Sequence, residues 1–141
     1  MPVEIVRVSP GAVEAFVRQT EREALKTLYD FSVIWHEQVH DFAAMDAGTI
    51  AGVAQIRIAA SLAHVDRVIV SQQQRRQGIG RALLAGAEEA ANYYNCHKMT
   101  LLVPHRGSAQ QFFERCGYRE EAVLPQHTFK LDMAVLRKFL L

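Results

Sequence analysis

A basic segment follows the apolar residues 68–70 and leads into a helical pattern that begins at Gly78. Two glycines, Gly78 and Gly80, stand at this junction. The first amides of a helix have no intrahelical partner and lie at the positive end of the helix dipole, so an arriving phosphate can accept several N–H bonds there. Gly78 and Gly80 leave room for a ligand to approach the backbone. The spacing Arg75-x-x-Gly78-x-Gly80 fits neither a P-loop nor the dinucleotide fingerprint. The turn therefore predicts a phosphate site of another kind.

This spacing resembles the Arg/Gln-x-x-Gly-x-Gly/Ala pyrophosphate loop of the GNAT superfamily of N-acetyltransferases. Such a short pattern also occurs in ordinary exposed turns. Two further segments resemble the family, however: residues 45–54, which read like its second hairpin, and Ala109-x-x-Phe-Phe113-x-x-x-Gly117-Tyr118, which reads like its later helix. The resemblance implies transfer of an acetyl group from acetyl-CoA to a primary amine by direct attack in a ternary complex, with no metal.

The resemblance also implies which residues hold acetyl-CoA. The pyrophosphate would bind the glycine turn, and the pantetheine arm would run along the preceding strand as an added strand does. A backbone N–H near Val68 or Ile69 would polarise the thioester carbonyl, and Phe113 would lie beside the thioester sulfur. The implied cofactor residues are Val68, Ile69, Val70, Arg75, Arg76, Gln77, Gly78, Ile79, Gly80, Arg81 and Phe113.

A base is useful because an amine of pKa about 10.4 is neutral about one time in a thousand at pH 7. His64 is the first candidate, since its unperturbed pKa is about 6.5, and Asp66 would act through water or orient it. Strand alternation predicts that His64, Asp66, Val68 and Val70 share one face. The alternative is an ordinary surface or hydrogen-bonded histidine. Weaker candidates near the expected acceptor side are His36, Glu37 and His40.

Two positions depart from the family pattern. Phe113 stands where many members carry a tyrosine that protonates the departing thiolate, and Arg106 stands at the usual asparagine position. A thiol of pKa about 8.5 leaves tolerably well unprotonated, so loss of the hydroxyl need not abolish transfer. Arg106 would meet a phosphate or a carboxylate-bearing acceptor, or simply lie exposed in a loop. Tyr118 is expected to pack rather than act as an acid.

Composition limits the remaining classes of protein. The 141 residues, 50% hydrophobic and 22% charged, suit one globular domain spanning residues 1–141, monomeric or a small oligomer such as a homodimer. A net charge of +1 gives no overall field for nucleic acid or an anionic membrane. Cys96 and Cys116 lack metal-binding spacing and are read as free thiols, with a disulfide left open. The sequence contains no long apolar span or signal-type segment, so a cytoplasmic protein is expected.

The periodicity predicts strands and helices in an α+β order with α/β-type layering. This is the layout of the GNAT family, and the resemblance implies helices that flank a central, mixed, mostly antiparallel twisted sheet. The resemblance adds a splayed pair formed by the fourth and fifth strands of the GNAT fold. The expected strands are residues 3–8, 39–45, 49–58, 62–70, 99–103, 118–124 and 126–133. A first helix is expected after Ser9 as its N-cap, a second over 23–29, and a third from Gly78. A fourth helix is expected from a Ser108/Gln111 capping box to Gly117, and a short terminal helix over 135–141.

The sequence leaves the acceptor open: a small molecule or a peptide amine would serve. A competing interpretation is a regulatory module that binds acyl-CoA without turnover. A nucleic-acid-binding protein is disfavoured, because the arginines are confined to one turn without interleaved aromatic residues.

Overall fold

The computed structural model describes residues 3–75 and 77–140, and the chain forms two compact units, residues 1–35 and 36–141. The first unit contains a 3₁₀ turn, Pro10–Val13, that continues into helix α1, Glu14–Leu28. The second unit contains strands β1 Gln38–Asp46, β2 Thr49–Ala59, β3 Leu62–Val70, β4 Lys98–Pro104, β5 Arg119–Leu124 and β6 Met133–Phe139, and helices α2 Ile79–Tyr93 and α3 Ser108–Arg115.

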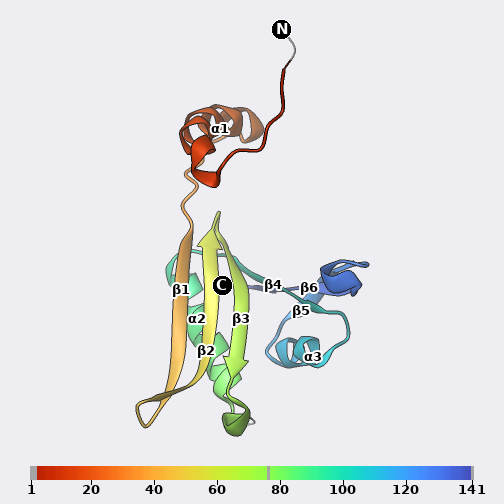
Figure 1. Ribbon diagram of the computed structural model, residues 1–141. Helices are drawn as coiled ribbons and strands as arrows, with labels where there is room; N and C mark the ends of the chain where they lie inside the picture. The colour runs from red at the N-terminus through yellow and green to blue at the C-terminus, as the bar shows by residue number, and fades with distance from the viewer. Residues whose placement is uncertain (1–2, 76, 141) are drawn as a thin grey trace. The chain divides into compact units, whose positions relative to one another are not determined.

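The second unit is built on a six-stranded sheet of order β1-β2-β3-β4-β6-β5 (Figure 1). The β3–β4 pair is parallel, whereas the other four neighbouring pairs are antiparallel. This is the mixed, mostly antiparallel sheet that the family resemblance implies. The short turns after β1 and β2 contain residues with positive φ, among them Gly48 at 82° and Ser61 at 65°.

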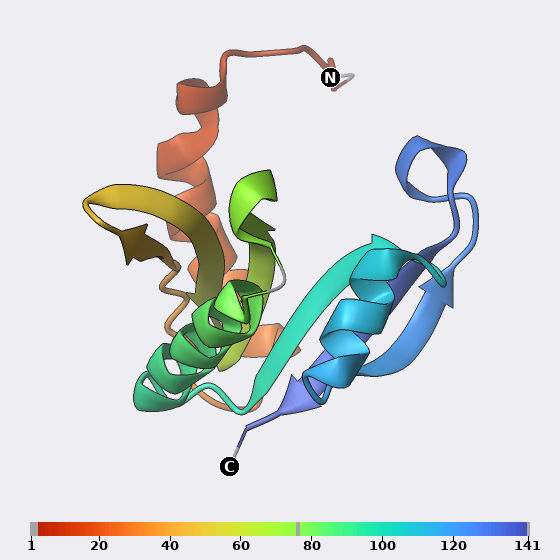
Figure 2. The same cartoon turned by 90° about the horizontal axis from the view of Figure 1, so that it is seen from below.

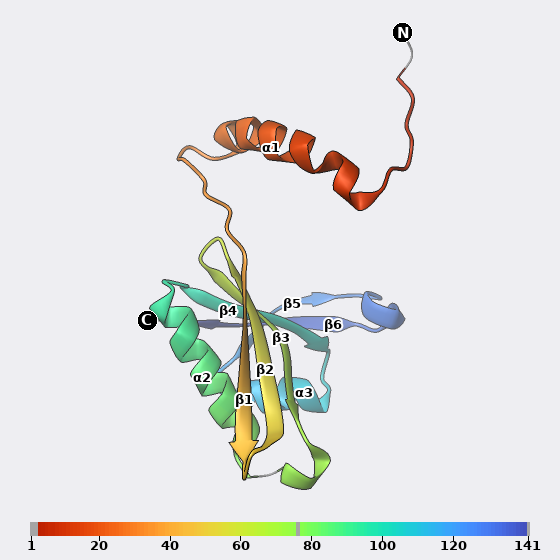
Figure 3. The ribbon, with the colours of Figure 1, turned by 60° about the vertical axis from the view of Figure 1, so that its left-hand side comes forward.

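Helices α2 and α3 pack on the same face of this sheet. Helix α2 contacts β1, β2 and β3, and α3 contacts β4 and β6 (Figure 3). A single apolar core includes Leu84 of α2, Phe113 of α3 and Leu101 of β4. The opposite face of these strands is mixed: the polar side chains of Arg57 and His64 lie there with exposed apolar side chains such as Val39, the cross-strand partner of Arg57.

Strands β3 and β4 are paired over only three residues. Their register runs from Leu62–Lys98 to His64–Thr100, and the two strands then diverge (Figure 2). The rest of β3, including Val68 to Val70, therefore has no ladder with β4. This is the splayed pair that the family resemblance predicts, and it leaves a backbone edge of β3 open beside the glycine turn.

The N-terminal expectations are partly wrong. Residues 3–8 belong to no strand, and Val3 and Ile5 are 86% and 89% exposed, since no described strand offers them a ladder. The chain from Pro10 forms one continuous helical segment rather than two. Ser9 precedes Pro10 as expected but makes no capping hydrogen bond through its side chain.

The C-terminal expectations also need correction. The final strand lies at Met133–Phe139, so residues 135–139 of the expected helix 135–141 form a strand. The expected strand 126–133 is mostly a turn. Residues 133–139 pair with β4 on one side and β5 on the other, so their apolar side chains face the core from a strand and not from a helix. The Ser108/Gln111 capping box is absent; the side chain of Gln110 accepts a hydrogen bond from the Arg106 amide instead, at 2.7 Å.

Cys96 and Cys116 are both free thiols. Burial raises the pKa of each, which keeps both in the neutral, less reactive form.

Candidate functional site

A cleft of about 620 Å³ lies where β3, the start of α2 and helix α3 meet. Its wall comes from three segments that are distant in the sequence: the end of β3, the glycine turn and the apolar side of α3. The lining residues are Val68, Ile69, Val70, Gln74, Arg75, Gly78, Ile79, Gly80, Arg81, Ser108, Ala109, Phe112, Phe113 and Arg115. Such a concave, largely apolar site with a few polar groups at one end is typical of small-molecule binding.

The glycine turn has a geometry that other residues would not readily adopt. Gly78 stands at the N-cap of α2 with φ of 77°, in the left-handed region. The amide of Ala82 bonds to the carbonyl of Gly78 at 3.0 Å, so the helical ladder begins there. The amides of Ile79 and Gly80 precede that first bond and remain available to an anion at the mouth of the cleft.

Gly80 also lies against α3. A Cβ at this position would lie 3.2 Å from Cζ of Phe112 and 3.6 Å from Cγ2 of Val70. The absent side chain therefore lets α2 begin close to both the α3 aromatic ring and the end of β3. Since these elements form the cleft wall, Gly80 sets its width.

Two arginines flank the turn. Nε of Arg75 donates to the carbonyl of Val70 at 3.3 Å, and a terminal nitrogen of Arg81 donates to the carbonyl of Arg115 at 3.3 Å. These bonds hold the guanidinium groups at the rim while leaving their other N–H donors free to meet phosphate oxygens. The helix amides and the two arginines together fit a pyrophosphate.

The ring of Phe113 lines the cleft and is also part of the core. It is 7% exposed and makes edge-to-face contacts with Phe112 and Tyr118, at centroid distances of 5.1 Å and 5.5 Å. Its position is thus fixed by packing on both sides.

A β-bulge changes which face each β3 residue occupies. Val65 pairs with Ile56 and Arg67 pairs with Gln55, so Asp66 is the additional residue. Beyond the bulge, Val68 pairs with the fully buried Ala54. The alternation that placed His64 and Asp66 on the face of Val68 is therefore wrong: an extra residue reverses the facing of everything after it.

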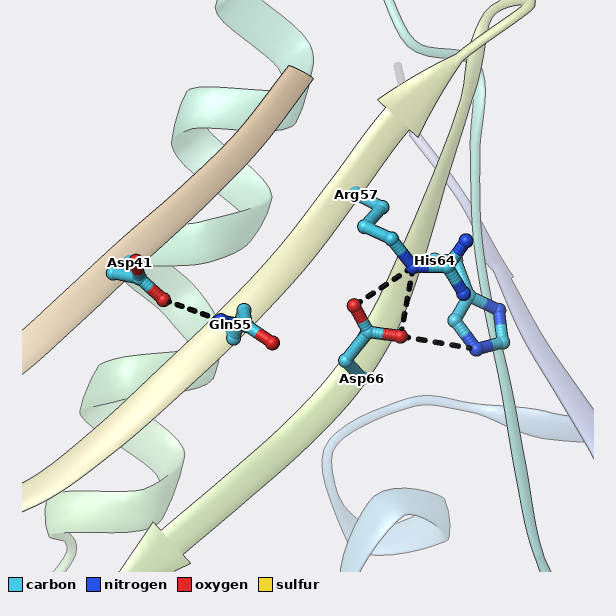
Figure 4. Close-up of polar contacts among 5 residues, drawn as sticks. All are labelled: Asp41, Gln55, Arg57, His64 and Asp66. Atoms are coloured by element: carbon cyan, nitrogen blue, oxygen red, sulfur yellow. Dashed lines mark hydrogen bonds and ion pairs between the residues drawn. The ribbon is translucent and has the colours of Figure 1, made fainter. Parts of the chain in front are cut away.

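His64 instead projects opposite α2, together with its cross-strand partner Arg57. Figure 4 shows Arg57, His64 and Asp66 grouped on the side of the strands away from α2. Nε of Arg57 lies 2.8 Å from Oδ2 of Asp66, and Nε2 of His64 lies 3.7 Å from Oδ1 of the same carboxylate. A second pair on this face joins Gln55 to Asp41 at 2.8 Å.

The environment keeps His64 neutral. Burial lowers its pKa from the usual 6.5, the Arg57 charge lowers it further, and Asp66 partly opposes both. A neutral imidazole at pH 7 is the form that can accept a proton.

Tyr118 is occupied elsewhere. Its hydroxyl, in a side chain 2% exposed, donates to Oε2 of Glu88 at 2.8 Å. Nζ of Lys138 donates to Oε1 of Glu88 and to the carbonyl of Cys116, both at 3.0 Å. Burial raises the pKa of Tyr118 well above its usual value, and the carboxylate of Glu88 adds to the effect. The hydroxyl is therefore tied into a structural network joining α2, β6 and the end of α3.

Most of the predicted cofactor residues come together in the cleft. Of the eleven, Gln77 is not in its lining, Arg76 lies outside the described residues, and the remaining nine line it. His64 and Asp66 are not lining residues. The sequence interpretation missed Gln74, Ser108, Ala109, Phe112 and Arg115 as part of the cleft.

The weaker sequence candidates lie elsewhere. His36 and Glu37 precede β1, and His40 lies in β1, where its Nε2 is 2.9 Å from Oε1 of Gln38 and its ring contacts Tyr94 at 4.9 Å. Arg106 lies in the β4–α3 loop with φ of 62°. Asparagine tolerates this left-handed conformation better than arginine.

The acetyltransferase (GNAT) domain family matches residues 5–128. An uncharacterized N-acetyltransferase of Methanocaldococcus jannaschii is 32% identical over 129 residues, covering 85% of this chain and 81% of that protein. The chain belongs to the GNAT acetyltransferase family, and its class of activity is that of a GNAT-type N-acetyltransferase.

Solved structures show the same fold. An acetyltransferase from Bacillus cereus superimposes with a TM-score of 0.79 at 22% identity over 98% of both chains. A Bacillus anthracis acetyltransferase solved in complex with acetyl coenzyme A gives a TM-score of 0.67 at 18% identity, over 71% of this chain and 61% of that one. Across residues 3–75 and 77–140, no helix is both long and apolar enough to cross a membrane.

Proposed function

We propose that this protein transfers the acetyl group of acetyl-CoA to a primary amine by direct attack in a ternary complex. The observation that carries the proposal is the arrangement around the β3–β4 splay. The cleft with its phosphate-binding turn lies on the helix side, and His64 projects from the other side of β3. An amine approaching from the face that carries His64 can therefore meet a thioester held in the cleft.

The cofactor would enter with its pyrophosphate at the amides of Ile79 and Gly80 and beside Arg75 and Arg81. The pantetheine arm would follow the open edge of β3 past Val68–Val70, because that edge has no ladder with β4. Acetyl-CoA supplies an activated acyl group as a thioester. Its acetyl end would reach the vicinity of Phe113, which closes the cleft on the α3 side.

In this proposal, His64 accepts the proton of the attacking amine at Nε2, directly or through water. The neutral amine nitrogen then forms its bond to the thioester carbonyl carbon and the carbon–sulfur bond breaks. The second proton of the nitrogen passes to the departing sulfur or to water, which leaves CoA and the acetylated amine. A backbone N–H near Val68 or Ile69 would stabilise the negative charge on the carbonyl oxygen. Asp66, held by Arg57, orients His64.

We further propose that residues 1–141 act as a single GNAT domain in the cytoplasm.

Thiol release from acetyl-CoA, measured with a panel of primary amines, tests the function. Amine-dependent release with a matching acetylated product in the mass spectrum is the expected result. A folded protein that binds CoA by calorimetry but releases thiol with no amine in a complete metabolite extract would contradict it.

A further inference from the structure

One cross-strand row on the face opposite α2 and α3 carries His64 and several cations. The sheet register pairs Arg57 with His64, His64 with Thr100, Thr100 with Arg137, and Arg137 with Arg119. Directly paired residues project from the same face of a sheet. His64 therefore shares its face with two arginines beyond Thr100, on β6 and β5.

The neighbours of Arg137 in β6 confirm this direction. Leu136 is fully buried in the core beneath the helices, and Lys138 bonds to Glu88 of α2. Because side chains alternate along a strand, Arg137 between them projects to the opposite face. Its guanidinium carbon lies 4.7 Å from the ring centre of Phe139, which supports the side chain from one side.

In the described part of the chain, Arg57 and Lys98 on this face are neutralised by carboxylates, whereas Arg119 and Arg137, like the exposed Arg67 of β3, are not. Arg57 pairs with Asp66 at 2.8 Å, and Lys98 pairs with Glu121 at 2.7 Å. Among the residues that the structure describes, neither Arg119 nor Arg137 has a carboxylate within 4.0 Å. The row thus holds two guanidinium groups whose donors are open to a ligand on the acceptor side.

We propose that Arg137, assisted by Arg119, binds a carboxylate of the acceptor whose amine is placed at His64. This inference rests on the proposed function. Neighbouring strands lie about 4.8 Å apart, so His64 and Arg137, two strands apart, are separated by roughly 10 Å across the sheet. An extended chain of three residues spans about 10 Å. The acceptor class is therefore an amino-carboxylate of about this length, such as a short peptide with free amino and carboxyl ends.

Glycine oligomers of one to four residues, each prepared with a free carboxyl end and with a C-terminal amide, test the inference. The measurement is kcat/KM for acetyl transfer from acetyl-CoA at fixed pH and ionic strength. We expect the acid to be preferred over its amide by about tenfold at the best length, because a charge-assisted guanidinium–carboxylate contact is lost in the amide. The preference should be largest near three residues.

Arg137→Gln should reduce the acid-to-amide ratio to near one, and Arg137→Lys should restore part of it, since lysine keeps the charge but not the planar fork. Arg119→Gln should reduce the ratio less. Lys130→Gln, in the connection between β5 and β6 and outside the row, is the matched control and should keep the full ratio.

Equal rates for acids and amides at every length, or an acid preference that survives Arg137→Gln, would overturn the inference while leaving acetyl transfer intact. Turnover of other amines but of neither oligomer series would overturn it as well. Failure to acetylate any amine would instead overturn the proposed function, and the inference with it.

Discussion

Nε of Arg57 lies 2.8 Å from Oδ2 and 3.0 Å from Oδ1 of Asp66, so a single guanidinium nitrogen contacts both carboxylate oxygens across β2 and β3. The carboxylate of Asp66 is therefore bound more closely by Arg57 than by His64, whose Nε2 lies 3.7 Å from Oδ1. Arg57 thus has two effects on the proposed base: it orients the neighbouring acid, and its charge disfavours the imidazolium.

Arg57→Gln should raise the pKa of His64, because one positive charge is removed and Asp66 becomes free to stabilise the imidazolium. In the native protein burial and Arg57 hold that pKa below 6.5, so the acid limb of kcat/KM should have its midpoint below 6.5. In Arg57→Gln, the acid limb of kcat/KM should shift to higher pH. The other charged groups nearby are Glu37, which acts on Arg57, and Arg137 across Thr100. A limb that does not move would exclude His64 as the titrating group; Lys130→Gln serves as the charge-change control.

His64→Gln should lower kcat/KM at pH 7 by about 10²-fold, because a positioned general base contributes at least that much. The deficit should shrink as the pH approaches 10, where more of the amine is already neutral. His127→Gln is the matched control, because this exposed histidine lies outside the site and its ring bonds to the hydroxyl of Thr128. A rate ratio that stays constant between pH 6 and 10 would identify His64 as structural.

The sequence predicted best where chemistry and local periodicity agree. The hairpin of β1 and β2, strand β3 and helix α2 have the expected bounds to within about three residues. The glycine turn was found because its residues carry their own conformational signal, with Gly78 at positive φ. Nine of the predicted cofactor residues line one cleft, and eight of them come from a single stretch of the sequence, residues 68–81, that leads from β3 into α2.

The remainder depends on tertiary contacts that no local pattern carries. The bulge at Asp66 is visible only in the register with β2, and it reverses the facing of Val68 relative to His64. Phe112 and Ser108 enter the cleft because α3 packs beside the start of α2, a long-range contact. The apolar residues 133–139 suit both a helix and a buried strand, and pairing with β4 and β5 decides for the strand.

Gly80→Glu should abolish CoA binding by calorimetry. A carboxylate would repel the pyrophosphate, and the added Cβ would lie 3.2 Å from the ring of Phe112. Gly86→Ala, in the same helix, is the control: nothing lies within 4 Å of its Cβ, so binding should be kept and stability should rise by about 0.5–1 kcal/mol. Unaltered affinity in folded Gly80→Glu would contradict the assignment of the cleft.

Phe113→Tyr adds one oxygen to a ring that lines the cleft and should leave the fold intact. If the hydroxyl reaches the leaving sulfur, kcat should rise, by about 10²-fold where protonation limits turnover. The measurement is single-turnover acetyl transfer, which separates chemistry from product release. An unchanged single-turnover rate together with lost stability would show instead that the hydroxyl enters the core and lacks a partner, a cost of about 1–3 kcal/mol.

Tyr118→Phe distinguishes a structural tyrosine from an acid. The hydroxyl donates to Glu88, which Lys138 also contacts, so its removal takes one charge-assisted bond from a network that joins α2 to β6. We expect a loss of about 1.5–3 kcal/mol in the free energy of unfolding by urea, with kcat unchanged, because the bond serves packing rather than the departing thiolate. The pKa of Tyr118 is raised above its usual value of 10, so its phenol stays protonated when ordinary tyrosines ionise. The tyrosinate absorbance that develops between pH 9 and 12 should therefore be the same in Tyr118→Phe as in the native protein. A large fall in kcat with stability preserved would reassign Tyr118 to the chemistry.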